Sequence, residues 1–132
     1  MSQLISNVDF APTFLELAGI PVPPIMQGRS FASLLKDPKT KFRDAVYYHY
    51  YEFPGEHSVM KHFGIRTDRY KLIRFYGEQN FWELYDLKTD PHEMNNVYRR
   101  QDKAVIIAGL KNRLLQLALE NRDEVAQNVL MK

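Results

Sequence analysis

The sequence contains no cysteine, which excludes disulfides, thiolate metal ligands and cysteine nucleophiles within its 132 residues. No apolar run approaches the ~20 residues that cross a bilayer. The first residues, MSQLI, lack the basic and apolar regions of a signal peptide. Charge of one sign does not dominate either, because 18 Lys and Arg stand against 16 Asp and Glu. A net charge of +2 is too small for broad attraction to nucleic acid or to an anionic membrane, so we expect neither as a partner.

Several motifs that carry chemistry are also missing. The chain has no GxGxxG, GxxxxGK[ST], HExxH or GxSxG pattern. None of its five serines lies in a recognisable activating context, and its four histidines are scattered rather than at ligand spacing. An enzyme that uses His49 or His57 therefore has no supporting pattern. We expect no catalytic residue, no metal ligand and no cofactor within this chain.

Aromatic residues are plentiful in the middle third, where the composition is typical of strands. Runs of β-branched and aromatic residues at 45–51, 59–66, 70–76 and 81–87 are separated by short polar turns. This pattern predicts an antiparallel meander of about four strands.

Apolar residues recur at helical spacing near the carboxy terminus, and they are Ile107, Leu110, Leu114 and Leu117. They predict a helix over residues 103–121 with one face packed on the meander. Residues 122–132 either fray or continue as helix.

A first helix is predicted after residues 4–8, which form a strand tail or an entry loop. Asp9 can cap this helix, and Gly19 can end it in the left-handed conformation. The polar, proline-broken segment 36–41 is a candidate domain boundary. The fold class is therefore α+β, in which a helix left over from an α/β domain precedes the meander and its carboxy-terminal helix.

Two segments allow a second interpretation. The acidic segment 86–93 has the composition of a calcium loop but not its ligand spacing, and Asp90 before Pro91 is more typical of a turn. The cations of residues 66–74 alternate with aromatic residues, as in sheets that stack RNA bases. Nearby acids dilute that charge, so recognition of a sulfate or carboxylate is the better hypothesis.

Four segments, in order, resemble the carboxy-terminal portion of type I sulfatases of the alkaline-phosphatase-like superfamily, such as arylsulfatases and iduronate-2-sulfatase. They are residues 8–20 (VDFAPTFLELAGI), 27–30 (QGRS), 64–73 (GIRTDRYKLI) and 83–96 (ELYDLKTDPHEMNN). The resemblance runs from about Ile5 to the final helix. It implies a sulfuric ester hydrolase whose α/β main domain is followed by a smaller subdomain.

The resemblance also implies a formylglycine nucleophile, made in a C/S-x-P-x-R motif, beside a calcium ion. This chain has no cysteine, and no serine has proline two positions on. It also lacks the Asp-Asp pair and the Asp-Asn-Gly or Asp-His-Gly motif of the metal ligands. The chain is therefore expected to be inactive alone, and calcium and formylglycine are implied only for a full-length enzyme.

On this basis residues 1–38 are expected to end the main domain and residues 39–132 to form the subdomain. The subdomain would support the active site and contribute its rim, where Lys61, His62 and Arg66 are candidates to attract a sulfated carbohydrate or an aryl sulfate. The expected partner is the rest of the sulfatase chain. Many sulfatases are exported, but a carboxy-terminal piece would carry no signal.

The alternative is a free-standing interaction module or a module that binds sulfated carbohydrate. A truncated α/β domain has one physical consequence. The face of the first helix that includes Phe14, Leu15 and Ala18 is expected to be exposed, or to be covered by a second copy of the chain.

Overall fold

The computed structural model describes residues 3–132, which divide into two compact units between Val46 and Tyr47. The first unit contains a short 3-10 helix, η1 (Asn7–Asp9), that runs directly into α1 (Phe10–Leu17). A proline-rich loop then leads to α2 (Ala32–Lys36). Residues 4–8 are therefore an entry segment and not the tail of a strand. Within residues 3–132, no helix combines the length and the apolar character that a membrane crossing requires.

The two ends of α1 differ in how well they were predicted. Gly19 has a φ of 71° just beyond the helix, as expected of a residue that ends it. Asp9 precedes α1, but its carboxylate does not bond to the α1 backbone. Because the 3-10 helix η1 precedes α1, Asp9 already lies within a helical segment and not at its start. Its buried carboxylate instead accepts the Ser6 N–H (2.7 Å) and contacts Arg43 (2.6 Å).

The core of the first unit lies beside α1 and α2 and consists of Phe31, Leu34 and Phe42. Helix α1 faces inward with Thr13, whose hydroxyl accepts the Phe31 N–H at 3.0 Å. Its apolar stripe points the other way, and Phe14 is 63% exposed. The expected exposure of this helix face is therefore confirmed.

The four predicted strands form one antiparallel sheet with the order β1-β2-β3-β4. The strands are β1 (Ala45–Tyr50), β2 (His62–Thr67), β3 (Tyr70–Phe75) and β4 (Phe81–Asp86). Each lies within one residue of its predicted range, except that β2 begins three residues late. Val59 lies in the exposed connection that precedes β2, where it has no sheet face to bury.

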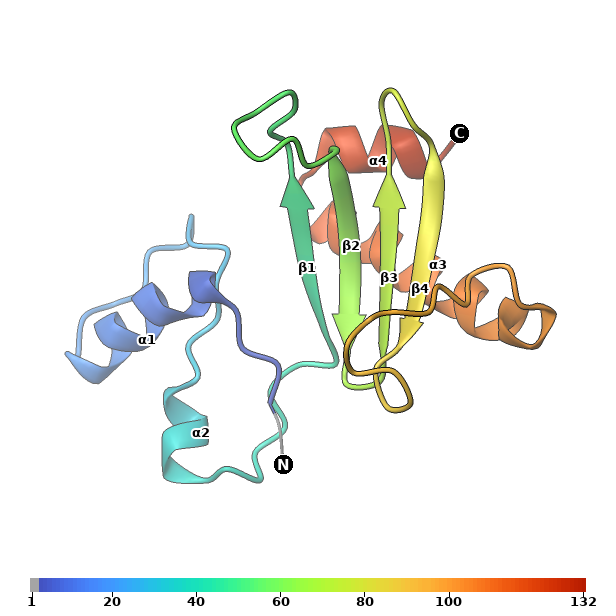
Figure 1. Cartoon of the computed structure of the whole chain (residues 1–132). Coiled ribbons are helices and arrows are strands. Elements are labelled where there is room, and N and C mark those ends of the chain that lie inside the picture. Colours follow the sequence, from blue (N-terminus) through green and yellow to red (C-terminus); the bar gives the residue numbers. More distant parts are fainter. Residues whose placement is uncertain (1–2) are drawn as a thin grey trace. The chain divides into compact units, whose positions relative to one another are not determined.

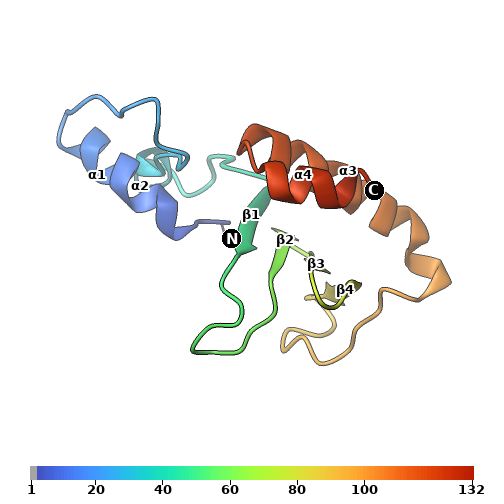
Figure 2. The same cartoon turned by 90° about the horizontal axis from the view of Figure 1, so that it is seen from above.

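The pairing register gives the sheet two different faces. Phe63 pairs with Arg74, and Leu72 pairs with both Ile65 and Leu84, so these side chains share one face. Phe63, Ile65, Leu72 and Leu84 are fully buried there. Figures 1 and 2 show the carboxy-terminal helices on this face and the connections 51–61 and 87–98 on the other side.

Helix α3 (Ala104–Glu120) confirms the predicted carboxy-terminal helix. It buries Leu110, Leu114, Leu117 and Ala118. The chain then turns at Arg122, which has a φ of 55°. The tail does not fray but forms a second helix, α4 (Glu124–Leu130), which the Asp123 carboxylate caps by accepting the Ala126 N–H at 2.9 Å.

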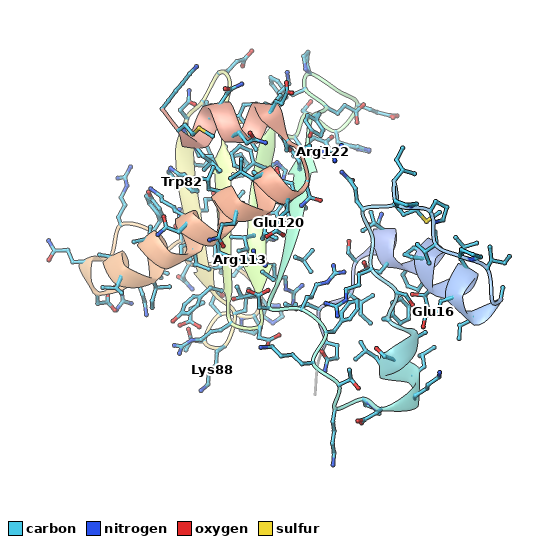
Figure 3. All side chains as sticks on the ribbon, turned by 180° about the vertical axis from the view of Figure 1, so that it is seen from behind. Glu16, Trp82, Lys88, Arg113, Glu120 and Arg122 are labelled. Atoms are coloured by element: carbon cyan, nitrogen blue, oxygen red, sulfur yellow. The ribbon has the colours of Figure 1, made fainter. Side chains whose placement is uncertain are left out.

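The free edge of β4 is covered by the chain that follows it. The Asn96 side chain accepts the Leu84 N–H at 3.0 Å, and the Val97 N–H donates to the Leu84 carbonyl at 2.8 Å. Trp82 of the same strand lies beside α3 in Figure 3, and Lys111 of that helix sits 4.5 Å from the centre of a Trp82 ring. The edge therefore cannot pair with another strand at these positions.

Candidate substrate-facing site

The sheet face without helices carries a row of four rings, one from each strand. Tyr50 stacks on His62 with 5.5 Å between ring centres, His62 lies 5.1 Å from Phe75, and Phe75 stacks on Phe81 at 4.4 Å. All four side chains are half-buried. Because the rings face one another across the strands, their edges point outward. This aromatic row is therefore a poor platform for a sugar ring but leaves ring-edge atoms accessible.

His62 occupies the middle of the aromatic row. Its Nδ1 donates to the Met60 carbonyl at 2.8 Å, since a carbonyl can only accept. This bond and the neighbouring rings fix the orientation of the imidazole. The Nε2 atom is the ring nitrogen left for an external group.

Of the other two predicted rim residues, Lys61 is next to His62 in the chain, whereas Arg66 lies far from it. Lys61 immediately precedes β2, and its carbonyl accepts the Tyr76 N–H at 3.2 Å. Arg66 shares the face of His62 but lies four residues along the strand, a distance of roughly 13 Å. Across residues 3–132, neither Lys61 nor Arg66 has an ion-pair partner. The backbone of Arg66 thus lies far from the end of β2 that carries Lys61 and His62.

The other cations of the 66–74 stripe are already engaged. Arg69 forms a two-pronged contact with Asp86 at 2.8 and 3.0 Å, and Lys71 bonds to Glu93 at 2.6 Å. The hydrogen bonds from Arg69, more than offsetting burial, lower the pKa of Asp86. The guanidinium carbon of Arg74 lies 5.3 Å from the centre of a Trp82 ring. These contacts give the three cations a structural role.

The sheet face without helices also carries a buried polar group that was not predicted from the sequence. The hydroxyl of Tyr48 is buried and has no hydrogen-bond partner within residues 3–132. Burial raises the pKa of Tyr48, and the nearby carboxylates of Glu93 and Glu83 raise it further. Tyr85 lies near the same carboxylates, and burial together with its hydrogen bond to Glu83 raises its pKa to about 12. Both phenols therefore stay neutral across the physiological range.

Asp123 and His49 form a polar network on the helix-covered face, which the sequence also did not reveal. His49 Nδ1 bonds to Asp123 Oδ2, and both side chains are almost fully buried. Burial alone would raise the pKa of Asp123, but hydrogen bonds from the Ala126 N–H, His49, Tyr47 and Tyr51 lower it to about 2. The only signal in the sequence was the alternation of Tyr47, His49 and Tyr51 along one strand.

The 86–93 segment forms the predicted turn. The carboxylate of Asp90 accepts the backbone N–H groups of Met94 (3.1 Å) and Asn95 (2.7 Å). Asp86 is occupied by Arg69. Among residues 3–132, no three histidine or acidic side chains gather at a point where they could hold a metal ion.

Comparison with known proteins finds a matching family model and several relatives of this chain. The family model described as "N-sulphoglucosamine sulphohydrolase, C-terminal" matches residues 1–120. The chain is 46% identical over 130 residues to an N-acetylglucosamine-6-O-sulfatase of Bacteroides thetaiotaomicron, an alignment that covers 96% of this chain and 23% of that relative. It is 32% identical over 101 residues to arylsulfatase K of Mus musculus, which covers 72% of this chain and 18% of the relative.

A solved structure agrees with these relatives. A protein in complex with its substrate D-glucosamine-2-N,6-O-disulfate superposes with a TM-score of 0.85 and 45% identity, over 89% of this chain and 24% of the other. The chain thus spans about a quarter of the length of such proteins, and the free-standing module is not favoured. By its motifs, its sheet and these relatives, the chain belongs to the N-sulphoglucosamine sulphohydrolase carboxy-terminal family, the carboxy-terminal domain of sulfatases.

Proposed function

We propose that this chain completes the substrate side of the active site in a sulfatase polypeptide whose α/β main domain cleaves the sulfate ester. The observation that carries this proposal is the 46% identity to the Bacteroides relative over nearly the whole chain. The names of that relative and of the bound substrate in the similar structure support a sulfated glucosamine as the substrate class. Residues 1–38 would then end the main domain, and residues 39–132 would form the subdomain.

Formylglycine and calcium would supply the bond-breaking chemistry in the main domain. The residues present here do not fit either group. The chain has no cysteine and no serine with proline two positions on. The described residues also offer no cluster of acidic or histidine ligands. We infer that this chain binds and orients the substrate instead.

His62 is the residue best placed for that role. A sulfate oxygen only accepts hydrogen bonds, and the Nδ1 proton of His62 is already donated to Met60. Contact with a sulfate therefore requires a proton on Nε2 as well, which makes the ring a cation. A charge-assisted hydrogen bond from this cation is stronger than a neutral one.

Lys61 and Arg66 would act at separate points of the substrate. Lys61 is adjacent to His62 in the chain and can add a second positive charge at the same end of β2. Arg66, at the far end of the strand, can reach only a different group of the substrate. We infer that the three residues form an extended cationic rim rather than a single pocket.

The test uses kinetics of the sulfatase polypeptide that contains these residues. We expect His62→Ala to raise KM for a sulfated glucosamine about ten-fold, a loss of roughly 1.4 kcal/mol of binding, with kcat nearly unchanged. His57→Ala is the matched control, because His57 is exposed in the connection just before His62. Equal kinetics for wild type and His62→Ala would remove His62 from the site.

A further inference from the structure

The connection between β1 and β2, residues 51–61, has little core of its own. Every one of its residues is exposed or half-buried. Between its two end residues, its hydrogen bonds are local, such as that from the Ser58 N–H to the Gly55 carbonyl at 3.1 Å. Lys61 ends this connection, and His62 follows it. The pairing of β2 with β3 holds the His62 backbone, but the carbonyl that accepts the His62 Nδ1 proton belongs to Met60 of the connection. Whatever holds the two ends of the connection therefore affects the orientation of the His62 ring and the position of Lys61.

The first end is held by Asp123, which lies between α3 and α4. Its Oδ2 atom accepts the hydroxyls of Tyr47 at 2.6 Å and Tyr51 at 3.0 Å, and it bonds to His49 Nδ1. The ring of His49 also stacks on Tyr51, with 3.7 Å between ring centres. Tyr51, the first residue of the connection, is thus fixed by a hydrogen bond and by a ring contact.

The second end is held through the other nitrogen of the same imidazole. His49 Nε2 bonds to the Tyr76 hydroxyl at 2.8 Å. The backbone N–H of Tyr76 donates to the Lys61 carbonyl at 3.2 Å. A chain of contacts therefore leads from Asp123 through His49 and Tyr76 to the residue next to His62.

We propose that Asp123 and His49 form a clamp that positions the 51–61 connection and, through it, Lys61 and His62. This inference rests on the proposed substrate-facing role of His62. The clamp is almost completely buried, with side-chain exposures of 3% for His49 and 6% for Asp123, so it touches no substrate. Its members are positioning residues.

A clamp and a purely stabilising network respond differently to the loss of a hydrogen bond. A stabilising network would lower the free energy of unfolding of the whole unit. A clamp would release residues 51–61 while the paired strands β2 and β3 stay ordered. Tyr76→Phe and Tyr51→Phe separate these cases, because each removes one hydroxyl and keeps the ring that packs on its neighbours.

The first experiment uses the 132-residue chain. We expect Tyr76→Phe and Tyr51→Phe to speed cleavage after Glu52 and Glu56 by a glutamate-specific protease about ten-fold, and to lower the backbone order parameters of residues 51–61. The order parameters of Phe63, Ile65 and Leu72 should not change. Tyr98→Phe is the control, because the Tyr98 hydroxyl has no hydrogen bond among residues 3–132. An unchanged connection, or equal loosening of the sheet, overturns the clamp.

The second experiment uses the sulfatase polypeptide. Tyr76→Phe should raise KM several-fold and leave kcat nearly unchanged, and it should add little to His62→Ala in the double variant. An additive double variant would overturn the positioning role, because the two residues would then act separately. If His62→Ala alone leaves KM unchanged, the proposed rim fails, whereas the protease result still decides whether the clamp exists.

Discussion

Gly64 lies at the centre of β2, where two neighbouring groups leave no room for a side chain. A Cβ atom at this position would come within 2.6 Å of the Leu72 carbonyl oxygen and 2.7 Å of the Tyr48 hydroxyl. The phenol of Tyr48 thus lies over the glycine of the adjacent strand, a pairing that recurs in natural sheets. This explains why the GIRTDRYKLI segment begins with glycine inside a strand, where glycine usually weakens the structure.

Gly64→Ala should therefore destabilise the chain. We expect a loss of about 1–3 kcal/mol, the usual cost of overpacking a closely packed site, measured by urea denaturation. Gly109→Ala is the control, because a Cβ there meets nothing within 4 Å. Gly109 lies in α3, where alanine should gain up to about 1 kcal/mol of stability. Equal effects of the two substitutions would contradict the packing of Tyr48 on Gly64.

Gly28, in the QGRS segment, is also required by a close contact. A Cβ atom there would collide with the Val8 carbonyl, so only glycine lets the two backbones meet. The next residue, Arg29, donates its N–H to Asp9 at 2.8 Å and its guanidinium to the Phe42 carbonyl at 2.7 Å. Two residues of this short motif thus have a structural reason that does not depend on catalysis.

At the scale of elements, the Asp123 carboxylate links the start of α4 to the sheet. Asp123 caps the helix through the Ala126 N–H and bonds to β1 through Tyr47 and His49. Removing this carboxylate leaves several buried donors without a partner, which is more costly than losing one hydrogen bond.

The pKa of Asp123 leads to a pH prediction. Since the folded chain holds this pKa at about 2, below the usual ~3.9, the unfolded chain takes up the proton first as the pH falls. The stabilisation, about 2 kcal/mol, is complete above about pH 5 and is lost as the pH falls through 4 toward 2. Asp123→Asn should remove this loss. The free energy of unfolding should then fall less steeply with pH, by the slope that belongs to the uptake of one proton, measured by urea denaturation from pH 6 to 2.

Asp68→Asn is the control for that measurement, because Asp68 is exposed in the turn between β2 and β3. It should keep the full acid slope. If Asp123→Asn loses as much stability as wild type between pH 4 and 2, the low pKa belongs to another carboxyl group.

At the scale of the whole molecule, the first unit presents an apolar surface to solvent. Its exposed side chains include Phe10, Phe14, Leu17, Ile20 and Ile25. Phe10 and Phe14 are neighbours, with 6.2 Å between their ring centres. Apolar side chains that gather on an exposed surface are typical of contacts with another protein surface. In the proposed sulfatase polypeptide the main domain would cover this surface, and in the isolated chain a second copy can take its place.

We therefore expect the isolated chain to self-associate in a concentration-dependent way, measured by sedimentation velocity. The double substitution Phe14→Ser and Leu17→Ser should shift it to monomer without loss of stability, because both side chains are more than half exposed. Val105→Ser is the control, since Val105 is also apolar and is even more exposed but lies on α3 of the second unit. A wild-type chain that stays monomeric at every concentration would show that this surface does not bind itself.

The sequence by itself determined the four strands, the first helix and α3 to within about three residues, because strand and helix periodicities and the turns between them are local. It did not predict α2 or the separate helix α4. It also determined the family, since four motifs occur in order. It did not reveal how residues gather in space. The pairing of Tyr50, His62, Phe75 and Phe81 depends on strand register, which a shift of one residue would destroy.

The tertiary structure alone decided which polar residues meet. Asp123 and His49 are 74 residues apart, and Asp9 and Arg43 are 34 apart, so no local pattern links them. The separation of His62 from Arg66, by contrast, follows from the predicted strand 59–66, because four residues span a long distance in a strand. Burial then changes the chemistry of each group, because a charge without water depends on its few remaining neighbours.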